Sequence, residues 1–209
     1  MKATETDEQP VVFVIDDDAA LRDALKKLFQ MVGLRAEVFG AVSEFLGNKL
    51  PDAPACLVLD IRLPGTSGLE LQAEWASAGI KIPIVFMTGY GDIPMTVQAM
   101  KAGALDFLPK PFRDQDMVDA VHRALERDRA RRQVERDGAQ LRSNFERLSP
   151  RERQVMVAIA KGLMNKQIAA ELGVAEITVK LHRSRLMQKM GARSVAELAR
   201  MAQILGIAS

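Results

Sequence analysis

A single cysteine, Cys56, occurs among the 209 residues of this chain. The chain therefore cannot form an internal disulfide bond, which is compatible with a reducing compartment. No apolar run approaches the roughly 18 residues that a membrane-spanning helix needs. The opening residues, MKATETDEQP, are too polar and too acidic for a signal peptide. These absences lead us to expect a cytoplasmic protein that has no membrane partner.

The charged residues are unevenly distributed, although the net charge of the whole chain is only +2. Residues 1–112 contain 10 Lys and Arg against 15 Asp and Glu, residues 113–148 contain 9 against 8, and residues 149–209 contain 10 against 4. The sequence thus indicates an acidic module followed by a basic one. A basic C-terminal module favours an anionic partner.

Five short apolar runs alternate with helical patterns in the first half of the sequence. They are VVFVI at 11–15, LRAEVF at 34–39, ACLVL at 55–59, PIVFM at 83–87 and ALDFL at 104–108. The first, third and fourth runs are almost continuously apolar, as expected for parallel strands that are covered on both faces. The alternation of strands and helices predicts a doubly wound α/β domain with a parallel sheet.

The segment between the two modules, residues 128–147, is mostly charged. We expect an exposed helical linker that prolongs the last helix of the first domain, and Gly138 disfavours an unbroken helix there. Val134, Leu141 and Leu148 lie seven residues apart, but Arg127 interrupts the series, so a coiled coil is the less favoured alternative. The expected domains are residues 1–127 and residues 148–209, joined by the linker 128–147.

Residues 148–209 predict an all-helical domain. The segments SPRE at 149–152 and SVAE at 194–197 have the form of capping boxes at helix starts. Between them, a short helix over 165–172, a turn at Gly173 and a longer helix to about Met190 predict a helix-turn-helix. In that motif the second helix enters the major groove of DNA.

Polar residues follow four of the five predicted strands, where the carboxyl ends of parallel strands meet at one edge of a sheet. Each of them alone could be an ordinary turn or surface residue, and Asp18 is best explained as a helix N-cap. Clustered carboxylates repel one another unless a cation lies among them, and Mg²⁺ prefers such oxygen ligands. An aspartate can also carry a phosphoryl group, which lysine and threonine side chains can stabilise. The polar residues that follow these four strands are Asp16, Asp17, Asp18, Asp60, Thr88 and Lys110.

The segments VIDDD, LVLDIRLPGTSG, VFMTGYGD and DFLPKPF occur in this order and resemble the receiver domain of two-component response regulators. The resemblance covers about residues 10–127 and implies a flavodoxin-like fold with a five-stranded parallel sheet. It also implies that Asp60 is the phosphoacceptor and that a sensor histidine kinase donates the phosphoryl group. Such a protein is not an enzyme beyond catalysing its own phosphorylation and dephosphorylation.

The same resemblance assigns roles to the residues around Asp60. Mg²⁺ would be bound directly by Asp17, Asp60 and the backbone carbonyl of Arg62, and through water by Asp16. Lys110 would pair with the phosphoryl group and Thr88 would hydrogen-bond it. Phe107 would be the aromatic switch, with an ordinary core phenylalanine as the alternative. Arg62 and Tyr90 would tune dephosphorylation.

The C-terminal segment from LSPRERQ to SVAEL also resembles the LuxR-type four-helix DNA-binding domain. Ala175 departs from the capping residue that often precedes the recognition helix in that family, which forfeits about 1 kcal/mol. On the longer helix, at about 100° per residue, the residues expected to pack inward are Val179, Leu186 and Met190. The residues expected over base edges are Lys180, Leu181, Ser184, Arg185 and Gln188.

Other residues of this domain are better placed for DNA phosphates, which position a protein without specifying sequence. For His182, a packed or solvated surface histidine is the alternative. The residues expected to contact phosphates are Asn165, Lys166, Thr178, His182 and Arg183.

Together the two resemblances identify the chain as a member of the NarL/FixJ group of transcriptional regulators, of the FixJ and StyR kind. Members of this kind typically pair through their receiver domains when phosphorylated, so we expect a homodimer bound to double-stranded DNA, with RNA polymerase as a further possible partner. A haloacid-dehalogenase-like phosphatase is an alternative, but DDDAAL lacks the threonine that it requires. An RNA-binding antiterminator is a third alternative, which duplex DNA affinity distinguishes.

Overall fold

The computed structural model describes residues 9–48, 50–63, 66–77, 79–89 and 93–207. The chain divides into two compact units between Arg132 and Gln133. The first unit thus extends beyond the expected domain boundary at residue 127. No described helix combines the length and apolar character that crossing a membrane would require.

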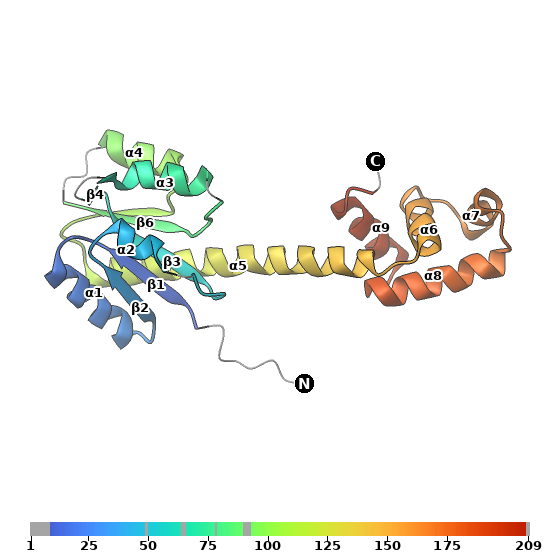
Figure 1. The fold of residues 1–209 in the computed structure, drawn as a ribbon, viewed down its shortest axis with the longest axis horizontal. Coiled ribbons are helices and arrows are strands. Elements are labelled where there is room, and N and C mark those ends of the chain that lie inside the picture. The colour runs from blue at the N-terminus through green and yellow to red at the C-terminus, as the bar shows by residue number, and fades with distance from the viewer. Residues whose placement is uncertain (1–8, 49, 64–65, 78, 90–92, 208–209) are drawn as a thin grey trace. The chain divides into compact units, whose positions relative to one another are not determined.

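The first unit is built on a parallel sheet of five strands (Figure 1). Their order is β2-β1-β3-β6-β7, and every neighbouring pair is parallel. This order is that of the flavodoxin-like class. The five predicted strands are therefore confirmed, with ends that differ by one or two residues. They are β1 (Val11–Ile15), β2 (Arg35–Phe39), β3 (Ala55–Asp60), β6 (Ile84–Thr88) and β7 (Asp106–Pro109).

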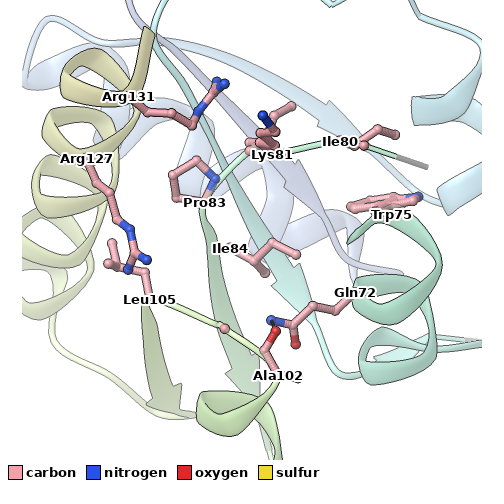
Figure 2. A pocket seen from close by; sticks show the side chains of 13 residues that line it. Gln72, Trp75, Ile80, Lys81, Pro83, Ile84, Ala102, Leu105, Arg127 and Arg131 are labelled. Carbon is pink, nitrogen blue, oxygen red and sulfur yellow. Dashed lines mark hydrogen bonds between the residues drawn. The ribbon is translucent and has the colours of Figure 1, made fainter. Parts of the chain in front are cut away.

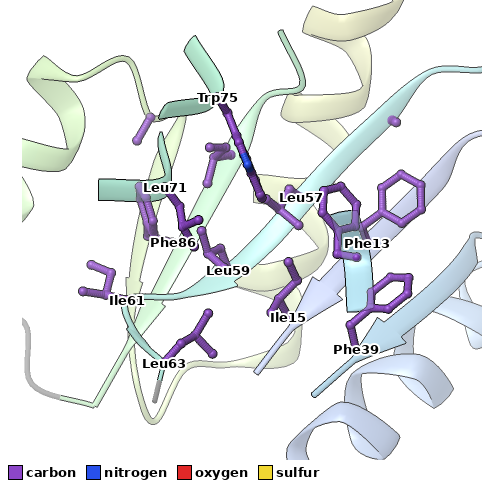
Figure 3. Close-up of a cluster of buried hydrophobic side chains, with 14 of the residues drawn as sticks. Phe13, Ile15, Phe39, Leu57, Leu59, Ile61, Leu63, Leu71, Trp75 and Phe86 are labelled. Atoms are coloured by element: carbon purple, nitrogen blue, oxygen red, sulfur yellow. The ribbon is translucent and has the colours of Figure 1, made fainter. Parts of the chain in front are cut away.

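Helices cover both faces of the sheet because successive residues of a strand point to opposite sides. Val12 and Val14 of β1 pack with the residues of α1 and α5, whereas Phe13 and Ile15 face the residues of α2, α3 and α4. Figure 3 shows Phe13, Ile15 and Phe39 in the hydrophobic cluster on the side of the sheet that α2, α3 and α4 cover. The helices are α1 (Ala19–Met31), α2 (Val42–Leu46), α3 (Gly68–Ser77), α4 (Ile93–Lys101) and α5 (Asp114–Glu146).

Helix α5 continues through Gly138 without a break. Gly138 disfavours a helix by about 1 kcal/mol, which is too little to break one of this length. Asp128 on this helix is fully buried and accepts a hydrogen bond of 3.0 Å from the backbone N–H of Ala55. Its carboxylate also binds the guanidinium groups of Arg131 and Arg132. The beginning of the predicted linker is thus attached to the start of β3, the central strand of the sheet.

The second unit is helical, as predicted. It contains α6 (Pro150–Ala160), α7 (Asn165–Leu172), α8 (Glu176–Met190) and α9 (Val195–Ile204). The capping box of Ser149 and Glu152 is complete. Ser194 also caps its helix, but Glu197 accepts from the backbone of Arg193 instead of returning to Ser194, so the second box is only half formed.

Candidate functional site

Three carboxylates meet at the carboxyl edge of the sheet in the first unit. Asp16 and Asp17 follow β1, and Asp60 is the last residue of β3, which lies beside β1. One oxygen from each of the three side chains lies within 4.8 Å of the others. Asp16 is fully buried and Asp60 is 7% exposed, whereas Asp17 is exposed. The predicted convergence of these acids is therefore present, with one side open to solvent.

Lys110, which follows β7, enters the same cluster. Its Nζ donates to Asp16 Oδ2 at 2.6 Å and to Asp60 Oδ2 at 2.7 Å. Burial lowers the pKa of Lys110, but the hydrogen bonds to the two carboxylates outweigh it, so the pKa is raised and the side chain stays charged. The backbone N–H of Lys110 donates to the carbonyl of Thr88 at 2.6 Å, which fixes the lysine to the end of β6.

Asp16 is held by more than this ion pair. Its Oδ1 accepts from the backbone N–H of Asp18 at 2.9 Å, and its carbonyl accepts from Arg22 Nη1 at 2.6 Å. Burial raises the pKa of Asp16 against the opposing effects of Lys110 and of the Asp18 backbone. Asp18 itself caps α1 through the backbone N–H groups of Ala20 and Leu21, as predicted.

The turn after β3 is shaped closely around Asp60. The backbone N–H of Arg62 donates to Asp60 Oδ1 at 3.1 Å. Gly68 lies so near that a Cβ atom there would come 3.0 Å from the carbonyl oxygen of Asp60 and 3.1 Å from Cα of Ile61. A larger residue would therefore displace the backbone that carries Asp60. The role of Gly68 was missed because the close approach is tertiary, and only the glycine-containing turn in LPGTSG could have indicated it.

The remaining predicted residues of this site lie as follows. Thr88 is fully buried at the end of β6, and its carbonyl joins it to Lys110. Phe107 lies half-buried on β7 and packs against the cluster that contains Phe13 and Trp75. Tyr90 lies outside the described residues.

The donor set fits a hard divalent cation. Three carboxylates face one ammonium group, so the cluster keeps an excess of negative charge that a second cation would reduce. Carboxylate and carbonyl oxygens are the ligands that Mg²⁺ takes, and the exposure of Asp17 leaves room for the water ligands that this ion retains.

In the second unit, α7 and α8 form the predicted helix-turn-helix. The turn begins at Gly173, whose φ of 65° lies in the left-handed region that favours glycine. No side chain caps α8 at Ala175, as expected. Val179, Leu186 and Met190 are buried among the residues of α6 and α7, which confirms the inward side of α8.

The opposite side of α8 is exposed. Ile177 is 72% exposed and Leu181 is 49% exposed, and the polar or basic residues that share this exposed side are Lys180, Ser184, Arg185 and Gln188. Lys180 Nζ lies 3.5 Å from Glu176 Oε1, in an exposed ion pair that is easily exchanged for another anion. The surface predicted over base edges is thus available to a partner.

The residues predicted to contact phosphates differ in their exposure to solvent. Lys166 is exposed, whereas Arg183 Nη1 donates to Asn165 Oδ1 at 2.7 Å and both side chains are half-buried. His182 and Thr178 are also half-buried, and His182 Nδ1 has no hydrogen-bond partner among the described residues. The structure therefore joins α7 to α8 through Arg183 and Asn165.

Two family descriptions match the sequence. Residues 12–122 match the response regulator receiver domain, and residues 146–202 match bacterial regulatory proteins of the luxR family. The chain is 57% identical over 206 residues to nodulation protein W of Bradyrhizobium diazoefficiens, with 99% of this chain and 91% of that protein covered. It is 42% identical to response regulator protein TmoT of Ectopseudomonas mendocina, with coverage of 95% and 90%.

Solved structures agree with these matches. The response regulator StyR shares 49% identity with a TM-score of 0.84, over 93% of this chain and 98% of that one. Full-length FixJ from B. japonicum shares 37% identity with a TM-score of 0.57, over 96% and 98%. With its acidic site at the edge of a receiver sheet and its helix-turn-helix, the chain belongs to the two-component response regulators of the NarL/FixJ type, transcription factors that join a receiver domain to a LuxR-type DNA-binding domain.

Proposed function

We propose that Asp60 accepts the phosphoryl group from a phosphohistidine of a sensor histidine kinase. The convergence of Asp16, Asp17, Asp60 and Lys110 at one sheet edge carries this proposal. An oxygen of Asp60 forms a bond to phosphorus while the bond between phosphorus and the histidine nitrogen breaks, and the histidine leaves with a proton. The product is an acyl phosphate on Asp60.

Geometry favours Asp60 over the other two acids as the nucleophile. Asp16 is fully buried, with no exposed surface, so an incoming phosphohistidine cannot reach it, whereas Asp60 keeps 7% of its surface exposed. Asp60 is the acid that both touches Lys110 and lies at the open rim. The ammonium group of Lys110 can pair with the Asp60 carboxylate before the transfer and with the phosphoryl oxygens after it.

Mg²⁺ fits the same site. Asp17, Asp60 and the backbone carbonyl of Arg62 would hold it directly, and Asp16 would act through water. The ion supplies neutralisation of charge on the phosphoryl oxygens. The Thr88 hydroxyl would donate to the phosphoryl group, and Phe107 would turn inward as that hydroxyl moves.

The output proposed for the second unit is sequence-specific binding of double-stranded DNA through α8. Its exposed side contains basic, amide, hydroxyl and apolar groups, which together can read guanine, adenine and thymine. We propose a cytoplasmic homodimer in the phosphorylated state, which matches two half-sites on DNA, and contact with RNA polymerase at the promoter. Catalysis would be limited to the protein's own phosphorylation and dephosphorylation.

The test is incubation of the full chain with acetyl phosphate and Mg²⁺. The wild type is expected to gain the mass of one phosphoryl group, to change its oligomeric state and to bind a selected operator more tightly. Asp60→Asn is expected to show none of these changes. Asp23→Asn, an exposed acid on α1, is the matched control and is expected to behave as the wild type. Phosphorylation of Asp60→Asn to the wild-type level would overturn the proposal.

A further inference from the structure

A cavity lies in the first unit, away from the acidic site. Its volume is about 500 Å³, within the range of about 300–1,000 Å³ that is common for small-molecule pockets. It opens where β6 begins at Ile84, whereas the acidic site lies where β6 ends at Thr88. At about 3.3 Å per residue, the two ends of the strand are about 13 Å apart. The pocket is therefore separate from the phosphoryl site.

One wall of the pocket is apolar. It is formed by Trp75 on α3 and by Ile80, Ile84 and Leu105, which come from the chain beside the starts of β6 and β7. Figure 2 shows Trp75 and Gln72 on one side and the two arginines of α5, Arg127 and Arg131, on the other. A ligand between these walls would contact apolar surface on one side and cationic groups on the other.

The two arginines differ in what they already bind. Arg131 is committed to the buried carboxylate of Asp128 through its Nε and Nη2 atoms, at 3.0 and 2.6 Å. Arg127 is exposed and forms no ion pair or hydrogen bond with any residue that the structure describes. Arg127 is therefore the guanidinium group that an anion in the pocket would pair with, in the bidentate geometry that carboxylates favour.

Gln72 adds a polar point to the α3 wall. The residue is 5% exposed, and its Nε2 donates to the carbonyl of Ala102 at 2.9 Å. Its Oε1 is buried and has no donor among the described residues. A buried oxygen that accepts no hydrogen bond costs free energy of folding. A ligand hydroxyl that donates to Oε1, after a small movement of the Gln72 side chain, would remove this cost.

We propose that this pocket binds a small monocarboxylic acid with a compact apolar body and one hydroxyl group. The carboxylate pairs with Arg127, the body packs against Trp75, Ile84 and Leu105, and the hydroxyl donates to Gln72. Because Arg127 belongs to α5, which also carries Asp128 and Arg131, the ligand joins this helix to α3. The receiver would thus sense a metabolite at the opposite edge of the sheet from Asp60, independently of the phosphoryl chemistry.

The experiment titrates the full chain with 4-hydroxycyclohexanecarboxylate, which does not absorb light at the wavelengths that excite tryptophan. Trp75 is the single tryptophan of the chain, so its fluorescence reports on this pocket alone. Wild type is expected to show a saturable change in fluorescence together with calorimetric heat at one ligand per chain. Absence of saturable binding, or heat without a response from Trp75, would overturn the proposal.

Three comparisons identify the contacts. Arg127→Gln is expected to weaken binding about tenfold or more, because it removes a charged hydrogen bond. Arg129→Gln removes the same charge from an exposed position of α5 outside the pocket and is expected to bind as the wild type does. The neutral methyl ester of the probe is expected to bind wild type about tenfold more weakly, which tests the charge without altering the protein.

Equal losses in Arg127→Gln and Arg129→Gln, or equal affinity for the acid and the ester, would contradict the proposed ion pair. Cyclohexanecarboxylate lacks the hydroxyl and is expected to bind about two- to tenfold more weakly than the hydroxy acid. Equal affinity for these two acids would overturn the role given to Gln72.

Discussion

At the scale of single residues, the chemistry of this protein depends on which groups share the edge of one sheet. Lys110 bridges Asp16 and Asp60, and this bridge explains how two acids can be buried side by side. The acids and the lysine were predicted from their positions after strands. Gly68 and Arg22 were not, because a backbone contact with Asp60 and a hydrogen bond to the carbonyl of Asp16 leave no periodic signal in the sequence.

A prediction at this scale concerns Tyr90. The residue stands two positions after Thr88 in the sequence, and a bulky side chain there is proposed to restrict the access of water to the acyl phosphate. Tyr90→Ala is therefore expected to lose its phosphoryl group faster than the wild type, as followed by the decay of the phosphorylated mass after acetyl phosphate is removed. Decay at the wild-type rate would disprove this role.

At the scale of helices and strands, the hydrophobic pattern and the capping residues were good guides. The five strands, the start of α1 at Asp18 and the start of α6 at Ser149 were all predicted from local sequence. The short strands β4 (Arg62–Leu63) and β5 (Thr66–Ser67) were missed because two residues are too few to show alternation. The sequence left the continuity of α5 open because Gly138 disfavours a helix, but this preference is weaker than the cooperativity of a long helix.

A prediction at this scale concerns the start of α6. Glu152 is 3% exposed, and its Oε2 accepts from the backbone N–H of Ser149 and from Lys189 Nζ, both at 2.7 Å. Burial raises the pKa of Glu152, but the hydrogen bonds from Lys189 and Ser149 outweigh it and hold the pKa below the ordinary value of 4.5. Because the folded pKa is lowered, the stabilisation is present above pH 4.5 and is lost as the pH falls through the folded value.

Glu152→Gln is accordingly expected to destabilise the second unit by about 1–2 kcal/mol at neutral pH, since a charged hydrogen bond is lost. The difference from wild type is expected to shrink in acid, when Glu152 is itself protonated. Scanning calorimetry of the full chain over a series of pH values measures this. Glu171→Gln, an exposed change on α7, serves as the control. A difference that stays constant with pH would contradict the assignment.

At the scale of the whole molecule, an acidic receiver domain precedes a basic DNA-binding domain, and the distribution of charge alone indicated an acidic module followed by a basic one. The fold of each part was predictable because two sets of motifs match known families. The boundary between the two parts was harder to predict. The first compact unit ends at Arg132, because Asp128 binds the backbone of Ala55 and the side chains of Arg131 and Arg132. The contact between Asp128 and Ala55 spans 73 positions of the sequence, and the charged composition of the segment concealed it.

The proposed DNA contacts give a prediction at this scale. Arg185→Ala is expected to cost about 1–3 kcal/mol on the preferred operator and to relax the sequence preference, because it would remove the proposed contact with a base edge. Lys166→Ala is expected to weaken binding to all sequences and to reduce the salt slope by about 1. Affinities measured over a range of salt concentrations distinguish the two variants. Arg129→Ala, which removes a charge from the first unit, is the control. Equal sequence preference in wild type and Arg185→Ala would contradict the proposed base contact.

The central claim is that the cluster at the sheet edge takes its phosphoryl group on Asp60. The direct measurement treats the full chain with acetyl phosphate and Mg²⁺, reduces the acyl phosphate with borohydride and locates the modified residue by tandem mass spectrometry. Reduction of Asp60 to homoserine, dependent on acetyl phosphate, is the predicted result. Modification of Asp16, Asp17 or a residue outside the cluster, with Asp60 unchanged, would contradict the claim.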